Sequence, residues 1–477
     1  MPESQKSFDK QYKNIWESIQ DSETPNLINS FSESYKDFIS YSKTERRAVQ
    51  FCRQLAQAKG FKPFSPEKKY KPGDKIFFIN RDKNIFLYTL GTKALEEGIN
   101  ILAAHIDVPR LDLKPNPLYE DSSMALLETH YYGGIKKYQW ATIPLALYGV
   151  IIKADGTKIE ISIGDDANDP VFYISDLLIH LSKDQLKKTL AEGISGDDLN
   201  VLCGSIPLVA ENDTDKKEKD PIKKNILKLL NEKYGIIEED LVGSEFELVP
   251  SGFARDVGFD RSMVAGYGHD DRSCSFAALR AILDMEGTPD KTSCVMLVDK
   301  EEIGSYGNTG LEGDFFVYTL LELLGNSTKN AGELTLKRAL LRSIALSADV
   351  TAAVDPNYPG VEDKKNAAFL NKGVVLKKYT GSRGKSGASD ANAEFVSYIK
   401  HLFNAHQIVW QTGELGKVDQ GGGGTVAFIL ARLNMEVLDM GIPLLSMHAP
   451  MEILAKADLF MAYKAYKLFL EKGDFRA

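Results

Sequence analysis

The sequence is short of cysteine, of long apolar runs and of positive charge. Its four cysteines, Cys52, Cys203, Cys274 and Cys294, lie far apart and form no C-x-x-C pair, which predicts reduced thiols. No stretch of about 18 apolar residues occurs, so we expect no membrane span. The first residues, MPESQKSFDKQYKNIW, are polar and carry no apolar signal core. These absences predict a cytoplasmic protein.

The formal charge of −9 argues against nucleic acid as the main partner, because phosphate requires a basic face. Hydrophobic residues make up 43% and charged residues 26% of the chain, an ordinary globular balance. Its 477 residues are more than one core usually holds. We therefore expect a folded protein of two domains.

Helix and strand patterns alternate in two separate parts of the chain. Before about Leu113, a helical pattern ending at Gly60 precedes the strand-like runs DKIFFIN, NIFLYTLG and GINILAAHID. From about Ser251 the alternation returns, and it closes in the helical segment MEILAKADLFMAYKAYKLFLEKG. Between them, Asp155-Gly156 joins two strand-like runs and predicts a hairpin, and the charged stretch 211–225 predicts an exposed loop.

This pattern predicts an α/β fold in which helices cover both faces of a sheet. We expect one discontinuous domain, 1–113 plus 253–477, and a β-rich domain inserted at 114–252. The insert carries Tyr131, Tyr132, Tyr138 and Trp140, residue types that are enriched in interface cores.

Polar side chains with metal-binding chemistry follow several of the buried strands. His105 and Asp107 end one apolar run, where His105 is a candidate ligand and Asp107 a candidate partner for its second ring nitrogen. Glu301 and Glu302 end another, and adjacent carboxylates are costly unless a metal offsets their repulsion. One of these two can bind metal while the other acts as a base.

Three further positions complete the pattern. His269-Asp270-Asp271 precedes a helix, where either aspartate also suits an N-cap, Asp349 follows an apolar run, and His448 precedes the last helix. Each position alone has an ordinary structural interpretation. Together, two histidines, two aspartates and one glutamate at strand ends suit Zn²⁺, Mn²⁺ or Co²⁺. Five ligands fit two metals about 3.5–4 Å apart if one carboxylate bridges them.

The segments AAHIDVPRLDLKPNPLYE, GHDDRSCSFAAL, DKEEIGS, SADVTAAVDPNYPG and SMHAPMEI together resemble the aspartyl aminopeptidase family of two-zinc metallopeptidases, with the bacterial aminopeptidase 1 type as the nearest pattern. The resemblance runs across nearly the whole chain. It implies a zinc-peptidase-like catalytic domain, with the insert as a dimerisation or lid domain. It also implies a homo-oligomer, usually a dodecamer.

The resemblance implies a role for each residue of the set. His105 and Asp349 bind one metal, Glu302 and His448 bind the other, and Asp270 bridges them. The sequence alone leaves open whether Asp270 or Asp271 is the bridge. Glu301 is then the general base, and Asp107 orients His105. His180, in the insert, resembles a family histidine that reaches the active site of a neighbouring subunit.

These assignments predict an aminopeptidase that removes the N-terminal residue of a peptide with a water activated by two divalent metals, expected to be zinc, with cobalt and manganese as alternatives. Arg383 and Lys385, in a Gly/Ser-rich loop, are candidates for binding an acidic first residue of the substrate; a solvated loop is the alternative. A two-metal carboxypeptidase or amidase, and a non-catalytic assembly protein on the same fold, remain rival functions.

Overall fold

The computed structural model describes residues 12–209, 219–327 and 331–475, so most of the charged stretch predicted as a loop at 211–225 lies outside the described residues. The chain forms two compact units. The first contains the residues up to Asp107, Ala254–Met447 and Glu452–Ala477, and the second contains Val108–Phe253 and His448–Met451. Among the helices that are described, none is long and apolar enough to cross a membrane.

The α-helices, with their bounds, are α1 (Ile15–Ser18), α2 (Thr24–Tyr41), α3 (Glu45–Ala58), α4 (Pro221–Tyr234), α5 (His269–Leu283), α6 (Phe315–Ser327), α7 (Glu333–Leu341), α8 (Ala393–Ala405), α9 (Ala427–Ala431) and α10 (Lys456–Lys472). The strands are β1 (Lys62–Pro63), β2 (Lys75–Asn80), β3 (Asn84–Thr89), β4 (Asn100–His105), β5 (Arg110–Asp121), β6 (Met124–Tyr132), β7 (Leu145–Ile152), β8 (Lys158–Ile163), β9 (Val201–Gly204), β10 (Glu245–Pro250), β11 (Arg255–Val257), β12 (Met263–Gly266), β13 (Ser293–Val298), β14 (Ile344–Ala348), β15 (Thr351–Ala352), β16 (Val374–Lys377), β17 (Gly381–Ser382), β18 (Trp410–Thr412), β19 (Gly422–Gly423), β20 (Glu436–Gly441), β21 (Pro443–Leu445) and β22 (Glu452–Ala455).

A mixed sheet forms the centre of the first unit. In the described residues its strand order is β1-β2-β3-β13-β4-β14-β20-β16-β18. The four central strands β13, β4, β14 and β20 run parallel. Parallel strands are buried on both faces, which explains their nearly continuous apolar sequences. Because they are parallel, their carboxyl ends meet at one edge of the sheet.

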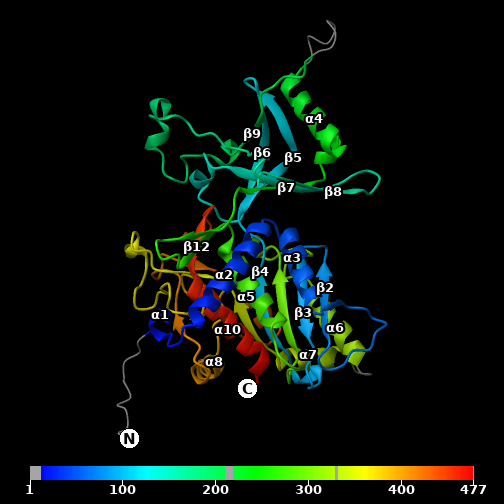
Figure 1. Ribbon diagram of the computed structural model, residues 1–477, viewed down its shortest axis with the longest axis vertical. Coiled ribbons are helices and arrows are strands. Elements are labelled where there is room, and N and C mark those ends of the chain that lie inside the picture. The colour runs from blue at the N-terminus through cyan, green and yellow to red at the C-terminus, as the bar shows by residue number, and fades with distance from the viewer. Residues whose placement is uncertain (1–11, 210–218, 328–330, 476–477) are drawn as a thin grey trace. The chain divides into compact units, whose positions relative to one another are not determined.

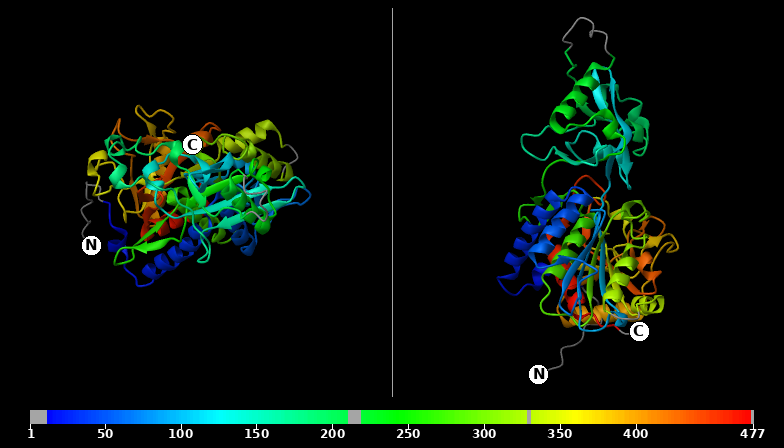
Figure 2. Two further views of the ribbon diagram at one scale, coloured as in Figure 1. Left: turned by 90° about the horizontal axis from the view of Figure 1, so that it is seen from above. Right: turned by 90° about the vertical axis from the view of Figure 1, so that its right-hand side faces the viewer.

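Helices cover both faces of this sheet, as predicted (Figures 1 and 2). Along β13, Val295 and Leu297 join the hydrophobic core that includes side chains of α2, α3, α5 and α10. The alternate residues Cys294 and Met296 join a second core with side chains of α6, α7 and α9. The two-residue period of a strand therefore divides one apolar sequence between two cores.

A smaller sheet of the first unit has the order β11-β12-β22-β21-β15 within the described chain. Its strand β22 lies where the sequence pattern indicated the start of the closing helix, and α10 begins only at Lys456. The backbone of 452–455 pairs with β12 and β21. This pairing overrides the helical pattern of MEIL.

The second unit is built on an antiparallel sheet of order β8-β7-β10-β5-β6-β9, counted over the residues that are described. The predicted hairpin at Asp155-Gly156 joins β7 and β8. Trp140 is fully buried in this unit, so the expectation that it lies in an interface core was wrong. Tyr131 and Tyr138 are 42% and 40% exposed. The predicted insert, 114–252, lies within this unit.

Candidate metal centre

His105 is the last residue of β4 and is 2% exposed. Its Nδ1 lies 3.0 Å from the backbone oxygen of Asp107, and its Nε2 lies 3.2 Å from Oδ1 of Asp270. Helix α5 holds the end of this strand, since the Ser275 hydroxyl donates to the backbone oxygen of His105 and Arg272 Nε donates to that of Ile106. The imidazole is therefore fixed at the carboxyl edge of the sheet.

Asp107 holds the turn that follows β13. Its Oδ1 accepts a hydrogen bond from the backbone N–H of Glu301, and its Oδ2 accepts one from that of Glu302, both at 3.1 Å. Gly304, with φ +94°, ends the short 3-10 helix formed by these residues, in a conformation that glycine adopts without a steric penalty. Asp107 therefore fixes the backbone from which both glutamates project.

Asp270 and Asp271 lie at the start of α5, and the bond between them is cis. The N-cap position is Gly268, so neither aspartate serves as the N-cap. Asp270 has φ −82° and ψ 109°, which is not helical. Its backbone N–H donates to Oε2 of Glu452, at 3.0 Å. The two carboxylates are 4% and 0% exposed.

Asp349 follows β14 and is buried beneath the same edge. A Cβ atom on Gly441 of the neighbouring strand β20 would lie 1.8 Å from the backbone oxygen of Asp349, so only glycine fits there. Lys377, at the end of β16, donates to the backbone oxygens of Asp349 and Val350 at 3.2 and 3.0 Å. The ends of β14 and β16 thus bring the buried ammonium group of Lys377 to the backbone of Asp349.

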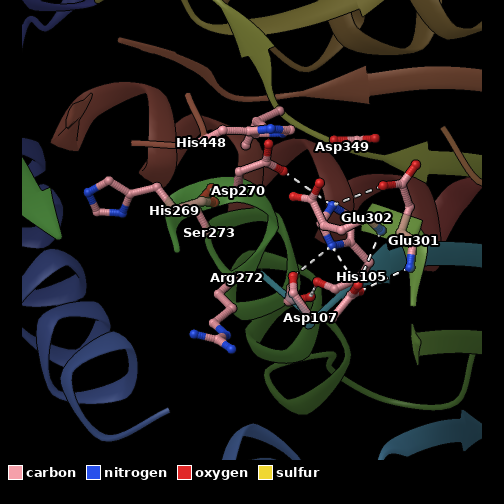
Figure 3. Close-up of polar contacts among 12 residues, drawn as sticks. His105, Asp107, His269, Asp270, Arg272, Ser273, Glu301, Glu302, Asp349 and His448 are labelled. Atoms are coloured by element: carbon pink, nitrogen blue, oxygen red, sulfur yellow. Dashed lines mark hydrogen bonds and ion pairs between the residues drawn. The ribbon is translucent and has the colours of Figure 1, made fainter. Parts of the chain in front are cut away.

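Two sets of three candidate ligands form at this edge. His105, Asp270 and Glu302 form one set, and His105, Asp271 and Asp349 form the other; within each set one ligand atom per residue lies within 4.8 Å of the others. Figure 3 shows the side chains of His105, Asp270 and Glu302 turned toward one another, with Glu301 beside them. Imidazole nitrogen and carboxylate oxygens without a thiolate form a donor set that suits zinc.

The site concentrates negative charge away from water. Burial raises the pKa of Glu301 to about 8; His105 opposes this shift, and the carboxylates of Asp349, Asp107 and Asp270 add to it. Burial likewise raises the pKa of Asp349 to about 6, against the lowering effect of Lys377. The pKa of His105 lies well above its usual range, because hydrogen bonds to Asp107 and Asp270 outweigh burial.

These shifts have one physical cause, which is the crowding of carboxylates in a buried space. An opposite charge nearby favours the ionised form, so a divalent cation would bring the carboxyl pKa values down again. The donor set and its electrostatics therefore both fit a metal.

The remaining predicted residues do not join this cluster within the first unit. His448 belongs to the second unit, where its Nδ1 lies 2.8 Å from the backbone oxygen of Gly134. His180, also in that unit, is exposed in a short 3-10 helix. Arg383 and Lys385 are exposed in the loop after β17, and Lys385 pairs with Asp390 at 3.0 Å.

Two residues of the centre escaped the sequence interpretation. Lys377 ends an apolar strand just as the ligands do, which was an available signal. Glu452 lies within SMHAPMEI, but its contact with the backbone of Asp270 depends on the pairing of β22 with β12. Sequence spacing does not reveal such a pairing.

Comparison with known proteins agrees with this chemistry. Residues 38–470 match the family model described as aminopeptidase I zinc metalloprotease (M18). A probable M18 family aminopeptidase 1 from Clostridium acetobutylicum is 50% identical over 465 residues, which cover 97% of this chain and 98% of the relative. One from Thermotoga maritima is 46% identical over 460 residues, or 96% and 99%.

Solved structures give the same result. The crystal structure of an M18-family aminopeptidase from Thermotoga maritima matches with a TM-score of 0.92 at 45% identity, covering 97% of this chain and all of that one. Aminopeptidase I from Clostridium acetobutylicum matches with a TM-score of 0.88 at 45% identity, covering 98% of this chain and all of that one. The predicted α/β metallopeptidase fold is thereby confirmed, and the chain belongs to the M18 family of zinc metallo-aminopeptidases.

Proposed function

We propose that this aminopeptidase uses two divalent ions, zinc by preference, held by His105, Asp349, Glu302, His448 and a shared Asp270. The observation that carries the proposal is the pair of ligand sets in the first unit, both of which include His105. Five ligands fit two ions when one carboxylate serves both, at the separation of about 3.5–4 Å that is typical of two-metal sites.

Asp270 is our choice for the shared ligand. Its Oδ1 lies 3.2 Å from Nε2 of His105, and its carboxylate raises the pKa of Asp349, so it acts on members of both sets. Asp271 is more deeply buried, and its carboxylate oxygens have no hydrogen-bond partner among the described residues, so it is the alternative shared ligand. Replacing each aspartate with asparagine separates the two, because loss of the shared ligand removes both ions.

His448 is the fifth ligand of the proposed set, and its position in the sequence supports this role. Glu452, which accepts the N–H of Asp270, follows it by four residues. In the second unit, Nδ1 of His448 faces the carbonyl of Gly134, which can only accept a hydrogen bond. This contact favours the tautomer with the proton on Nδ1 and a lone pair on Nε2, the form in which imidazole binds metal.

Zinc supplies Lewis-acid chemistry in such a site: it lowers the pKa of water and stabilises negative charge on a carbonyl oxygen. Glu301 is placed to accept the proton of the attacking water and to return it to the leaving amine. Its Oε2 lies 3.9 Å from Nε2 of His105, so the carboxylate lies beside the proposed metal ligands, where a general base is needed. Asp107 contacts both the backbone of Glu301 and the ring of His105, so it fixes the positions of these two residues relative to each other.

The test of this function is a screen of aminoacyl reporter substrates with chelated enzyme to which Zn²⁺, Co²⁺ or Mn²⁺ is returned. Metal-dependent cleavage of free-amine reporters supports an aminopeptidase. Cleavage of N-blocked peptides instead indicates a carboxypeptidase or amidase, and no cleavage with any metal indicates a non-catalytic protein. Glu301 argues against the last alternative, since an assembly protein needs no base there.

We further propose that the enzyme prefers peptides with an acidic first residue, bound by Arg383 and Lys385. Both cations are exposed in a loop, where φ is +50° and +62°. Lys385 already pairs with Asp390 and lies 3.8 Å from the ring centroid of Tyr379. Arg383 is therefore the more available partner for a substrate carboxylate, and charge-assisted hydrogen bonds give such a contact its strength.

Self-assembly through the second unit, into a dodecamer as the resemblance implies, is also proposed. The segment around His180 exposes six large apolar side chains, each between 46% and 73% accessible: Leu177, Leu178, Ile179, Leu181, Leu186 and Leu190. Exposed apolar patches of this kind mark interaction sites. His180 would then enter the active site of a neighbouring copy.

The four free cysteines, three of them buried, support a place in the reducing cytoplasm.

A further inference from the structure

A buried carboxylate lies behind the proposed shared ligand. Glu452 is the first residue of β22 and is 1% exposed. It stands opposite Gly266 in the ladder with β12, and its Oε2 accepts the backbone N–H of Asp270 at 3.0 Å. A buried acid is costly unless its hydrogen bonds and charge have a use. The position of Glu452 suggests that its use concerns Asp270.

The backbone of Asp270 requires an outside acceptor. The first N–H groups of a helix have no partner within the helix, and the N-cap residue here is a glycine with no side chain to serve them. With ψ at 109°, Asp270 also departs from helical geometry, so the helix does not fix its conformation. The hydrogen bond to Glu452 supplies that restraint from a neighbouring strand.

The neighbouring imidazole of His269 is already committed to other groups. Its Nδ1 lies 2.6 Å from the hydroxyl of Tyr35, and its Nε2 lies 3.1 Å from the backbone oxygen of Val264. Since that carbonyl accepts from Nε2, the tyrosine hydroxyl donates to Nδ1 and the ring is neutral. His269 therefore brings no positive charge to the turn that would offset the carboxyl group of Glu452.

We infer that Glu452 is a positioning residue for the metal centre: it fixes the backbone of Asp270 so that the Asp270 carboxylate faces His105, and its charge strengthens cation binding. The inference rests on the proposed role of Asp270 as a ligand. The same residue follows His448 by four positions, so it also anchors the chain directly after the proposed second histidine ligand. Partners of this kind, behind the ligands, are worth about 10–100-fold in metal affinity.

The test compares Glu452→Gln and Glu452→Ala with wild type in the full chain. Zn²⁺ affinity is measured by competition with a chromophoric chelator, and the Co²⁺ absorption spectrum reports ligand geometry. Glutamine keeps an acceptor but loses the charge, so it should weaken Zn²⁺ binding about 10-fold, and alanine about 100-fold with an altered Co²⁺ spectrum.

Asp458→Asn is the matched control. Asp458 is also fully buried and accepts backbone N–H groups, from Asn371 at 2.6 Å and Gly373 at 2.8 Å, but it lies outside the ligand sets. It should lower the unfolding temperature and leave Zn²⁺ affinity unchanged. An equal loss of affinity in this control would overturn the inference, because the effect would then be general destabilisation.

The remaining outcomes distinguish an error in the role of Glu452 from an error in the metal centre itself. Wild-type Zn²⁺ affinity and an unchanged Co²⁺ spectrum in Glu452→Gln would refute the role of Glu452 alone. Failure of the wild-type chain to bind Zn²⁺ would refute the metal centre and, with it, this inference. If Glu452→Ala does not fold, Glu452→Gln alone decides the question.

Discussion

Nε2 of His105 lies 3.2 Å from Oδ1 of Asp270, although the two residues are 165 positions apart in the chain. The first ends the central strand β4, and the second lies in the first turn of helix α5, which packs beside that strand. This contact joins two of the places that supply the proposed metal ligands. The residues around it have different proposed roles, and each role predicts a different effect of substitution.

The adjacent glutamates should respond differently to the same substitution. Glu301→Gln should bind Zn²⁺ as wild type does but lose turnover by at least about 100-fold, as expected for the loss of a general base. Glu302→Gln should instead lose metal, because Glu302 belongs to a ligand set. Elemental analysis and kcat measured on the same samples distinguish them. Near-wild-type turnover in Glu301→Gln would show that the base lies elsewhere.

Acid should remove a stabilising contribution from Asp256. Burial raises the pKa of this carboxyl, but hydrogen bonds from Lys36, Lys456 and Arg261 outweigh it and hold the pKa below its usual range. Since the folded pKa is depressed, the contribution is full above the unfolded value of about 4 and is lost as pH falls below it. Asp256→Asn should therefore cost about 2 kcal/mol at pH 7.

Urea unfolding at a series of pH values checks this prediction. The difference in free energy of unfolding between wild type and Asp256→Asn should stay constant from pH 7 to about pH 5 and shrink below about pH 4. Asp184→Asn is the control, because Asp184 and its partner Lys187 are 90% and 65% exposed and such surface pairs contribute little. A difference that grows toward low pH would contradict the assigned direction of the pKa shift.

The exposed apolar segment around His180 predicts an assembly. Light scattering at micromolar concentration should give a mass well above the 52.9 kDa of one chain. His180→Phe should keep this mass but lose activity, whereas His130→Phe, at another exposed histidine of the second unit, should change neither. A monomer mass would refute the assembly, and full activity in His180→Phe would refute a shared active site.

Substrate preference should depend more on Arg383 than on Lys385. Wild type should show a higher kcat/KM for Asp- and Glu-peptides than for Leu- and Lys-peptides. Arg383→Ala should reduce the ratio of kcat/KM for Asp-peptides to kcat/KM for Leu-peptides about 10-fold, the size expected for one charge-assisted hydrogen bond. Lys385→Ala should do less because Lys385 is paired with Asp390, and Lys364→Ala, at an exposed lysine, should do nothing. A preference for Leu over Asp would refute acidic specificity.

The sequence predicted the layers of the first unit well, because buried parallel strands and their covering helices have strong local patterns. It also placed His105, Glu301 and Asp349 at strand ends, and parallel pairing then brings those ends to one edge of the sheet. Glu452 could not be assigned in this way, and the position of Lys377 at a strand end did not reveal which residues it contacts. Their contacts depend on which strands become neighbours, and local patterns do not encode that choice.

The second unit was harder to predict in detail. Residues 165–200 combine apolar side chains with turn-forming ones, and they form 3-10 turns instead of longer elements. Trp140 looked like an interface residue from its type alone, yet it is fully buried. Composition shows that a side chain is apolar, but it does not distinguish burial within one chain from burial between chains.

The central claim is that two metal ions held by this ligand set activate the enzyme. The most direct test titrates chelated wild type with Zn²⁺ while hydrolysis of a free-amine aminoacyl reporter is followed. Activity should rise until about two equivalents of Zn²⁺ per chain are bound, as in two-metal hydrolases, and the N-acetylated reporter should not be cleaved. Full activity at one equivalent, or activity that persists without metal, would contradict it.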